Sequence, residues 1–217
     1  MNIVIQCAAR KHEHAGYFRT LDGRTVLFVA DPRKAPSSSS YLHARPDDRS
    51  DAGISWRDRL LQYNRESVSN EFGLLRAIDL YAHPAYQRLA SARNITQSYI
   101  LSAGWGLIRA DFLTPYYDIT FSSAAESYKR RISVDNYRDL NMLPSEANEP
   151  TLFFGGKDYV PLFCELTKSV KANKIVFFNS ANAPRAPGCS LIRYPTKTRT
   201  NWHYECLTAF LDGRIRV

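Results

Sequence analysis

The chain lacks long apolar runs, and its few cysteines are scattered. No apolar run approaches the roughly 20 residues of a membrane-spanning helix, and the run at residues 3–5 is too brief for a signal peptide. The cysteines form neither a Cys-x-x-Cys pair nor a zinc-finger spacing, which predicts reduced thiols. They are Cys7, Cys164, Cys189 and Cys206. We therefore expect a cytoplasmic protein with no membrane partner, metal or organic cofactor, and no obligate protein partner is evident.

Several catalytic motifs are also missing. Gly155, Gly156 and Lys157 do not have the spacing of a Walker P-loop. Ser102 is followed by Ala-Gly and is not framed as Gly-x-Ser-x-Gly, so a hydrolase nucleophile elbow is not indicated. His12 and His14 stand near one another without a third ligand, which argues against a metal site.

The charge balance is strongly basic. The chain of 217 residues has 29 Lys and Arg against 21 Asp and Glu, a net charge of +8. Such a balance favours an anionic partner such as nucleic acid. A hydrophobic content of 44% is enough to bury one good core in a chain of this length, so we expect a single domain over residues 1–217.

Short apolar runs alternate with segments of helical spacing, which predicts a layered α/β fold with a mainly parallel sheet. Strands are expected at residues 3–6, 26–30, 99–102, 152–154 and 175–179. Helices are expected at 57–64, 74–81, 84–92, 124–132, 159–170 and 204–211. Residues 31–55 hold three prolines and a run of four serines, which predicts a long loop that covers a substrate groove or is disordered.

The segment 99–121 concentrates chemically useful side chains directly after an expected strand. Gly104 and Gly106 allow a sharp turn and a close approach to a ligand, and Trp105 lies between them. Ligands of open α/β sheets bind where strands end in this way. The loop that follows supplies a cation, two carboxylates and two adjacent aromatics, which are Arg109, Asp111, Asp118, Tyr116 and Tyr117.

Three runs carry a resemblance to a known family. They are Ala-Ile-Asp-Leu-Tyr at 77–81, Tyr-Ile-Leu-Ser-Ala-Gly-Trp-Gly-Leu-Ile at 99–108 and Pro-Tyr-Tyr-Asp at 115–118. With the opening Gln-Cys-Ala-Ala-Arg at 6–10, the chain resembles a bacterial family related to the peroxide-stress protein YaaA. The family has a single tyrosine where this chain has two, so Tyr116 and Tyr117 compete for that position.

The resemblance implies a three-layer α/β/α sandwich similar to uracil-DNA glycosylases. It also implies a DNA base glycosylase, because one branch of the group removes glucosylated hydroxymethylcytosine from phage DNA in antiviral defence. The uracil-DNA glycosylase signatures Gly-Gln-Asp-Pro-Tyr and His-Pro-Ser are absent from this chain. A uracil-specific enzyme is therefore not expected.

Hydrolysis of an N-glycosidic bond passes through an oxocarbenium-like state, so a carboxylate is the first requirement. Asp118 is the first candidate, since two tyrosines that can stack on a flipped base precede it, and Asp111 is the reserve. The alternative for both is a structural role, because aspartate commonly caps helices and satisfies turns. For Asp111 that structural role is favoured.

Two further clusters suit a nucleic acid. Lys157, Asp158 and Tyr159 follow a strand and a glycine pair, where a phosphate contact, a helix cap and a stacking ring are expected, although a plain turn explains the glycines equally well. Because an exposed, protonated Lys157 is a poor nucleophile, simple hydrolysis is favoured over strand cleavage. The segment 193–204 interleaves cations with aromatics. Its candidates are Arg193, Lys197, Arg199, Asn201 and His203, the alternative being that its aromatics pack a closing helix.

The sequence thus predicts a DNA glycosylase that flips out a modified base and leaves an abasic site. Asp118, Asp111 and His203 are the catalytic candidates. The substrate-binding candidates are Gln6, Arg10, Gly104, Trp105, Tyr116, Tyr117, Lys157, Asp158, Tyr159, Arg193, Lys197, Arg199 and Asn201. The alternatives are a non-catalytic DNA-binding stress protein and an enzyme acting on free nucleosides or nucleotides, such as an N-glycosidase or a deoxyribosyl transferase.

Overall fold

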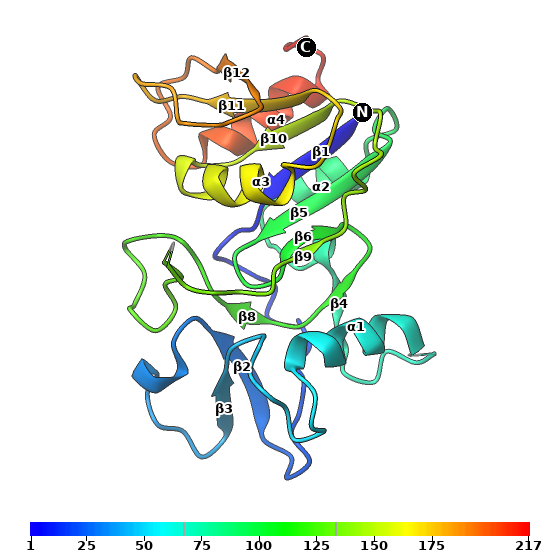
Figure 1. Ribbon diagram of the computed structural model, residues 1–217, viewed down its shortest axis with the longest axis vertical. Coiled ribbons are helices and arrows are strands. Elements are labelled where there is room, and N and C mark those ends of the chain that lie inside the picture. Colours follow the sequence, from blue (N-terminus) through cyan, green and yellow to red (C-terminus); the bar gives the residue numbers. More distant parts are fainter. Residues whose placement is uncertain (67, 133) are drawn as a thin grey trace.

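A computed structural model describes residues 1–66, 68–132 and 134–217, and its centre is a seven-stranded sheet (Figure 1). The order across the sheet is β12-β11-β10-β1-β5-β6-β9. In chain order these strands are β1 (Asn2–Gln6), β5 (Gln97–Ser102), β6 (Gly106–Arg109), β9 (Leu140–Asn141), β10 (Thr151–Phe154), β11 (Lys174–Phe178) and β12 (Ser190–Arg193). The helices are α1 (Trp56–Glu66), α2 (Pro84–Ala90), α3 (Val160–Leu166) and α4 (Trp202–Leu211), with 3-10 turns η1 (Pro32–Lys34), η2 (Ala77–Asp79) and η3 (Lys157–Tyr159).

The run from β5 to β12 through β1 is parallel, and its order reverses beside β1. β1 pairs in parallel with both β5 and β10, and β10, β11 and β12 then follow outward on one side. β6 is antiparallel to β5 and closes the other side with β9. The chain therefore adds β5 on one side of β1 and, later, β10 on the other. This reversal of strand order leaves a crevice at the carboxyl ends of β1 and β10.

Helices cover both faces of this sheet. Phe153 of β10 stacks on Phe163 of α3 with ring centroids 4.7 Å apart, and its neighbour Phe154 lies 5.7 Å from Phe210 of α4. Successive strand residues point to opposite faces, so α3 and α4 lie on different sides, as Figure 1 shows. α2 packs beside α4, where the hydroxyls of Tyr86 and Tyr204 are 3.3 Å apart. The predicted α/β fold with a mainly parallel sheet is confirmed.

A second sheet lies below the first in Figure 1, in the order β3-β2-β8. Its strands are β3 (Tyr41–Ala44), β2 (Thr25–Val29) and β8 (Tyr117–Asp118). The strand expected at 26–30 is therefore present but does not join the central sheet. The prediction of an unstructured loop over 31–55 is wrong at β3, which pairs in parallel with β2. A two-stranded pair, β4 (Leu75–Arg76) and β7 (Leu113–Thr114), completes the described strands.

Two predicted helices do not form, because their backbone groups bond to distant segments. At 74–81 the chain makes β4 and η2, where the N–H groups of Ala77 and Ile78 donate to the carbonyls of Phe112 and Ala110. Residues 124–132 form turns, in which the carbonyl of Tyr128 accepts from the N–H groups of Ala30 and Asp31. Helical spacing in the sequence does not reveal such long-range partners.

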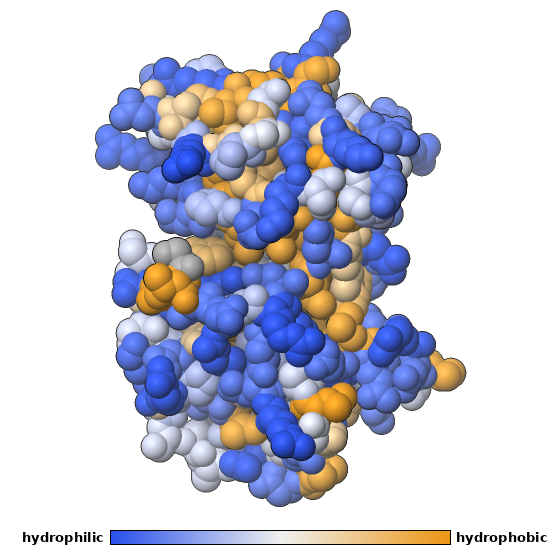
Figure 2. Space-filling model, in the orientation of Figure 1, coloured by the Kyte–Doolittle hydropathy of each residue, from blue (hydrophilic) through white to orange (hydrophobic). Residues whose placement is uncertain are grey.

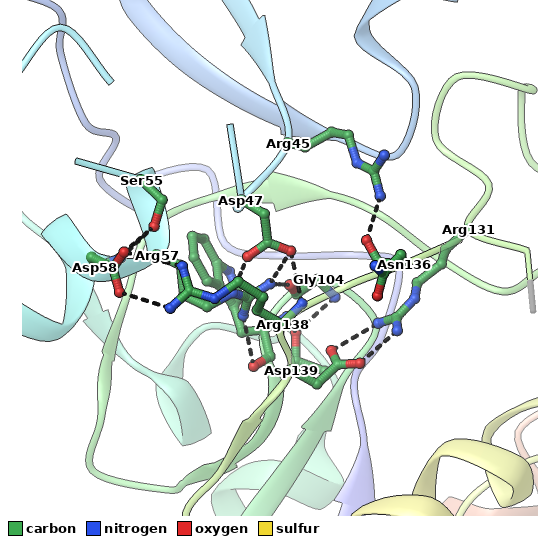
Figure 3. A network of polar contacts seen from close by, with 12 residues as sticks. Arg45, Asp47, Ser55, Arg57, Asp58, Gly104, Arg131, Asn136, Arg138 and Asp139 are labelled. Carbon is green, nitrogen blue, oxygen red and sulfur yellow. Dashed lines mark hydrogen bonds and ion pairs between the residues drawn. The ribbon is translucent and has the colours of Figure 1, made fainter. Parts of the chain in front are cut away.

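Buried arginines hold the turn between β5 and β6 (Figure 3). Arg57 donates to the carbonyls of Gly104 and Trp105, both at 3.1 Å, and Arg131 donates to the carbonyl of Ala103 at 2.9 Å. Asp47 pairs with Arg57 and Asp139 with Arg131. Three successive carbonyls of the turn are thus occupied by protein groups. Gly104 and Trp105 were predicted as ligand contacts, but both are buried at this turn and their carbonyls already accept from Arg57.

Hydrophilic side chains cover most of the face seen in Figure 2, with apolar residues gathered between the upper and lower parts. Within the described ranges, every helix is too short or too polar to cross a membrane. All four cysteines are free, and the sulfur atoms of Cys164 and Cys189 lie 3.9 Å apart.

Candidate functional site

Two adjoining cavities lie at the carboxyl ends of β1 and β10, where the strand order reverses. The larger has a volume of about 710 Å³ and the smaller about 370 Å³. They share a wall formed by Cys7, Ala8, Ala9, Thr120, Ser122 and Tyr159. The position matches the crevice in which open α/β sheets bind ligands, and the small alanines directly after β1 leave room for one.

The floor of the larger cavity joins β1 to β10. The side-chain oxygen of Gln6 accepts a hydrogen bond of 2.6 Å from the N–H of Gly156, and the carbonyl of Gln6 accepts one of 2.6 Å from the hydroxyl of Tyr86. These bonds fix the Gln6 amide in one orientation. Its nitrogen has no hydrogen-bond partner within the described part of the chain, so it is available to a ligand that carries an acceptor.

The start of α4 forms one side of the larger cavity. Asn201 precedes the helix in a left-handed conformation, with a φ of 61°, and its side chain does not cap the helix. Arg199, Asn201 and His203 all line the cavity. Arg10 lines the same cavity from the segment after β1, and both arginines are exposed. The cavity therefore offers an amide for hydrogen bonding and two cations for an anionic ligand.

His203 lies almost wholly within the protein. It is 4% exposed, and its Nε2 has no hydrogen-bond partner among the residues described. Burial, with a smaller contribution from nearby His83, lowers the pKa of His203 to about 3. The imidazole is therefore neutral at physiological pH. A catalytic role of His203 therefore does not include donation of a proton from a charged imidazolium to a leaving group.

Asp118 faces the smaller cavity from the end of β8. Its carboxylate is 2.9 Å from the ammonium of Lys129, which is also paired with Glu126 at 2.6 Å. The hydrogen bonds that the Lys129 ammonium donates to Glu126 and Asp118 raise the pKa of Lys129. The ion pair anchors Asp118 against the turns that follow β8, and just over a quarter of its side chain is exposed. A fixed carboxylate in a partly enclosed cavity suits the stabilisation of a developing cation.

Lys11, which the sequence analysis missed, lines the same cavity as Asp118. It is 7% exposed, and its Nζ lies 3.5 Å from the carbonyls of Ala8 and Ala9 and 4.2 Å from the ring centroid of Tyr117. Burial lowers the pKa of Lys11, while the charges of Cys7 and Asp118 act in the opposite direction. Its position directly after the Cys-Ala-Ala-Arg run was the only signal available.

Buried hydroxyls and the thiol of Cys7 lie in and behind the shared wall. The sulfur of Cys7 is 3.2 Å from the hydroxyl of Tyr159, and the hydroxyl of Tyr117 is 2.8 Å from that of Tyr81 and accepts from Ser102 at 2.9 Å. Burial raises the pKa of all three tyrosines. They are therefore neutral phenols that support the wall.

The structure brings together only part of the predicted site. The larger cavity is lined by Gln6, Arg10, Asp158, Tyr159, Arg199, Asn201 and His203, and the smaller by Asp118 and Tyr159. Neither cavity is lined by Asp111, Gly104, Trp105, Tyr116, Tyr117, Lys157, Arg193 or Lys197. Of these, Lys157, Arg193 and Lys197 are exposed and stay available to a large anionic ligand.

The reasons for these exclusions are local. Asp111 is exposed and paired with Arg109 at 3.0 Å, near the amino end of β5, where the N–H of Ala110 donates to the carbonyl of Ser98. It is therefore at the opposite end of that strand from the cavities. Tyr116 stacks on Tyr17 at 5.1 Å, and Tyr117 is fully buried. Neither ring is placed to stack on a base in these cavities.

Comparisons with family models, with curated proteins and with solved structures found no match to this chain. The cavities and the residues that line them are therefore the basis for assigning a function.

Proposed function

We propose that the protein hydrolyses the N-glycosidic bond of a modified base in DNA and leaves an abasic site. The observation that carries this proposal is the pair of adjoining cavities, one with amide groups and cations, the other with an anchored carboxylate. A nucleotide extruded from DNA has a base, a sugar and phosphates that need these different surroundings. The resemblance to glycosylases of the uracil-DNA glycosylase architecture, including those of anti-phage defence, points in the same direction.

In this mechanism the base occupies the larger cavity and the sugar lies against the shared wall. The amide nitrogen of Gln6 and the side chain of Asn201 hydrogen-bond the base and stabilise it as it leaves. Asp118 faces the sugar from the smaller cavity and stabilises positive charge at C1′ or orients the attacking water. Arg10 and Arg199, at the exposed side of the larger cavity, bind the flanking phosphates. The volume of about 710 Å³ suits a base that carries a substituent.

The test is an assay of purified protein on unmodified, uracil-containing, hydroxymethylated and glucosyl-hydroxymethylated DNA. Abasic sites and released base are both measured. Asp118→Asn is the test variant, and Asp111→Asn is its matched control, since Asp111 is exposed and lies away from both cavities. We expect abasic sites on one modified DNA, their loss in Asp118→Asn and their retention in Asp111→Asn.

Other results would replace the proposal. Tight, salt-sensitive DNA binding without base release from any of the four DNAs would identify a non-catalytic binding protein. Base release from free nucleosides or nucleotides, with little dependence on salt, would identify a small-molecule N-glycosidase or transferase. Equal activity of the two asparagine variants would remove Asp118 from the mechanism.

A further inference from the structure

We propose that Lys11 is a second catalytic residue, whose amine condenses with the aldehyde of the abasic site so that the protein also cleaves the DNA strand. This inference rests on the proposed function, because base removal supplies the abasic sugar. It differs from the expectation of simple hydrolysis, which considered Lys157 alone. Lys157 is exposed and lines neither cavity, whereas Lys11 lies beside Asp118 in the smaller one.

The contacts of Lys11 set it apart from the other lysines near the site. Lys129 is paired with Asp118 and Glu126, but no carboxylate forms an ion pair with Lys11 in the described ranges. The nearest acceptors of its Nζ are two carbonyls at 3.5 Å, the upper limit of a hydrogen bond. A buried amine with such weak partners is poorly held and is accessible to an electrophile in the cavity.

The surroundings of Lys11 favour its neutral, nucleophilic form. The Nζ of Lys11 lies over the rings of Tyr81, Tyr116 and Tyr117, 4.2 Å from the centroid of Tyr117. These ring faces attract a cation, but they take the place of the water that would otherwise solvate the ammonium group. Burial is the largest influence on the pKa of Lys11 and lowers it; the charges of Cys7 and Asp118 raise it, that of Lys129 lowers it, and the net direction is downward. Desolvated lysines of this kind form Schiff bases with carbonyl groups.

Lys11 and Asp118, which both line the smaller cavity, carry out the steps of the proposed reaction. The Lys11 nitrogen bonds to C1′ of the ring-opened sugar, and the aldehyde oxygen leaves as water, which gives an imine protonated by solvent. Asp118 removes a proton from C2′ and later passes it to solvent, the electron pair forms the C2′–C3′ double bond, and the C3′–O bond breaks, so that the phosphate on C3′ leaves with its oxygen as the 5′-phosphate of the other fragment. Water then hydrolyses the imine and returns the free amine of Lys11. The products are an unsaturated aldehyde on one fragment and a 5′-phosphate on the other.

The experiment uses DNA with a preformed abasic site, so it does not depend on base removal. Cyanoborohydride reduces the imine to a stable amine, and the modified residue in the wild-type protein is identified by peptide mass spectrometry. We expect the adduct on Lys11, and its loss in Lys11→Arg. Lys174→Arg is the matched control, because Lys174 is also buried but donates to the carbonyls of Thr167 and Val170 and lines neither cavity. The Lys174→Arg variant should still form the adduct on Lys11.

The outcomes separate this inference from the proposed function. An adduct on Lys11 of the wild-type protein supports the inference even if the arginine variant fails to fold. An adduct only on other amines, or no adduct, overturns it. If base release from modified DNA is nevertheless observed, the glycosylase proposal stands without a lyase step. An adduct on Lys11 without base release from any DNA supports the role of Lys11 and overturns the glycosylase proposal.

Discussion

The side-chain oxygen of Gln6 lies 2.6 Å from the backbone nitrogen of Gly156 and accepts its hydrogen bond. This contact joins the ends of β1 and β10, two strands 150 positions apart in the chain. Gln6 also lines the larger cavity. One side chain therefore contributes both to the link between the strands and to the lining of the larger cavity.

Replacing Gln6 separates these two contributions. Gln6→Leu removes the acceptor and leaves the Gly156 N–H unpaired, which should lower the free energy of unfolding by about 1–3 kcal/mol. Gln6→Glu keeps an acceptor and should lose less stability, but it lacks the amide donor, so base release should fall in both variants. Urea unfolding and the abasic-site assay measure the two effects. Unchanged stability of Gln6→Leu would show that the bond contributes nothing net.

The adjacent glycines Gly155 and Gly156 should respond differently to alanine. A Cβ at Gly155 would lie 2.3 Å from the ring of Phe153, which is stacked on Phe163. Gly155→Ala should therefore destabilise the protein by about 1–3 kcal/mol. A Cβ at Gly156 would meet Gln6 at 3.4 Å, and the backbone there is extended, so Gly156→Ala should unfold like the wild type. Thermal denaturation of the pair is the measurement, and equal melting temperatures would contradict the prediction.

The arginines that hold the β5–β6 turn should matter far more than surface arginines. Arg57 is 1% exposed and binds two carbonyls and Asp47. Arg57→Met leaves these acceptors buried without a donor, which should cost about 3–5 kcal/mol. Arg109→Met removes an exposed pair with Asp111 and should cost at most about 1 kcal/mol. The denaturant midpoints of the two variants are compared, and similar midpoints would refute the structural role of Arg57 at the turn.

His203 should make the protein sensitive to mild acid. Its pKa is about 3 in the folded protein, whereas an unfolded histidine titrates near pH 6.5. The unfolded state therefore binds the proton first, so this stability is fully present above about pH 6.5 and is lost as the pH falls toward the folded pKa. Between pH 6.5 and 4.5 the loss should be roughly 2–3 kcal/mol.

The comparison that isolates this effect uses two glutamine variants. His203→Gln has no titrating group at the buried position, so its free energy of unfolding should fall less steeply with acid than that of the wild type. His14→Gln changes an exposed histidine and should keep the full dependence. Parallel slopes for the two variants across this pH range would show that His203 is not buried as a neutral group.

Much of the central sheet was predictable because its strands are short apolar runs with polar or glycine-rich ends. Residues 3–6 and 152–154 were placed correctly for this reason, and their ends form the candidate site. The expected helices at 74–81 and 124–132 did not form because distant backbone groups, such as the carbonyl of Phe112 and the N–H of Ala30, take up their hydrogen bonds. Local spacing contains no information about those partners.

The same difference between local sequence patterns and long-range contacts applies to the site residues. Gln6, Asn201 and His203 line the larger cavity, and each lies at or beside the end of an element that the sequence indicates. Gly104 lines neither cavity, and its carbonyl accepts from Arg57, which is 47 positions away. Lys11 was missed because its burial depends on the ring of Tyr117, which lies in another sheet. In each failure the deciding contact is long-range.

The candidate site draws on both sheets, since Gln6 ends β1 of the central sheet and Asp118 ends β8 of the three-stranded one. A ligand that fills both cavities contacts both sheets at once. Its binding free energy then opposes their separation, by an amount that grows as RT ln(1 + [L]/Kd). We therefore expect a ligand that fills both cavities to act as a reversible cross-link between the two sheets, so that they unfold more cooperatively when it is bound.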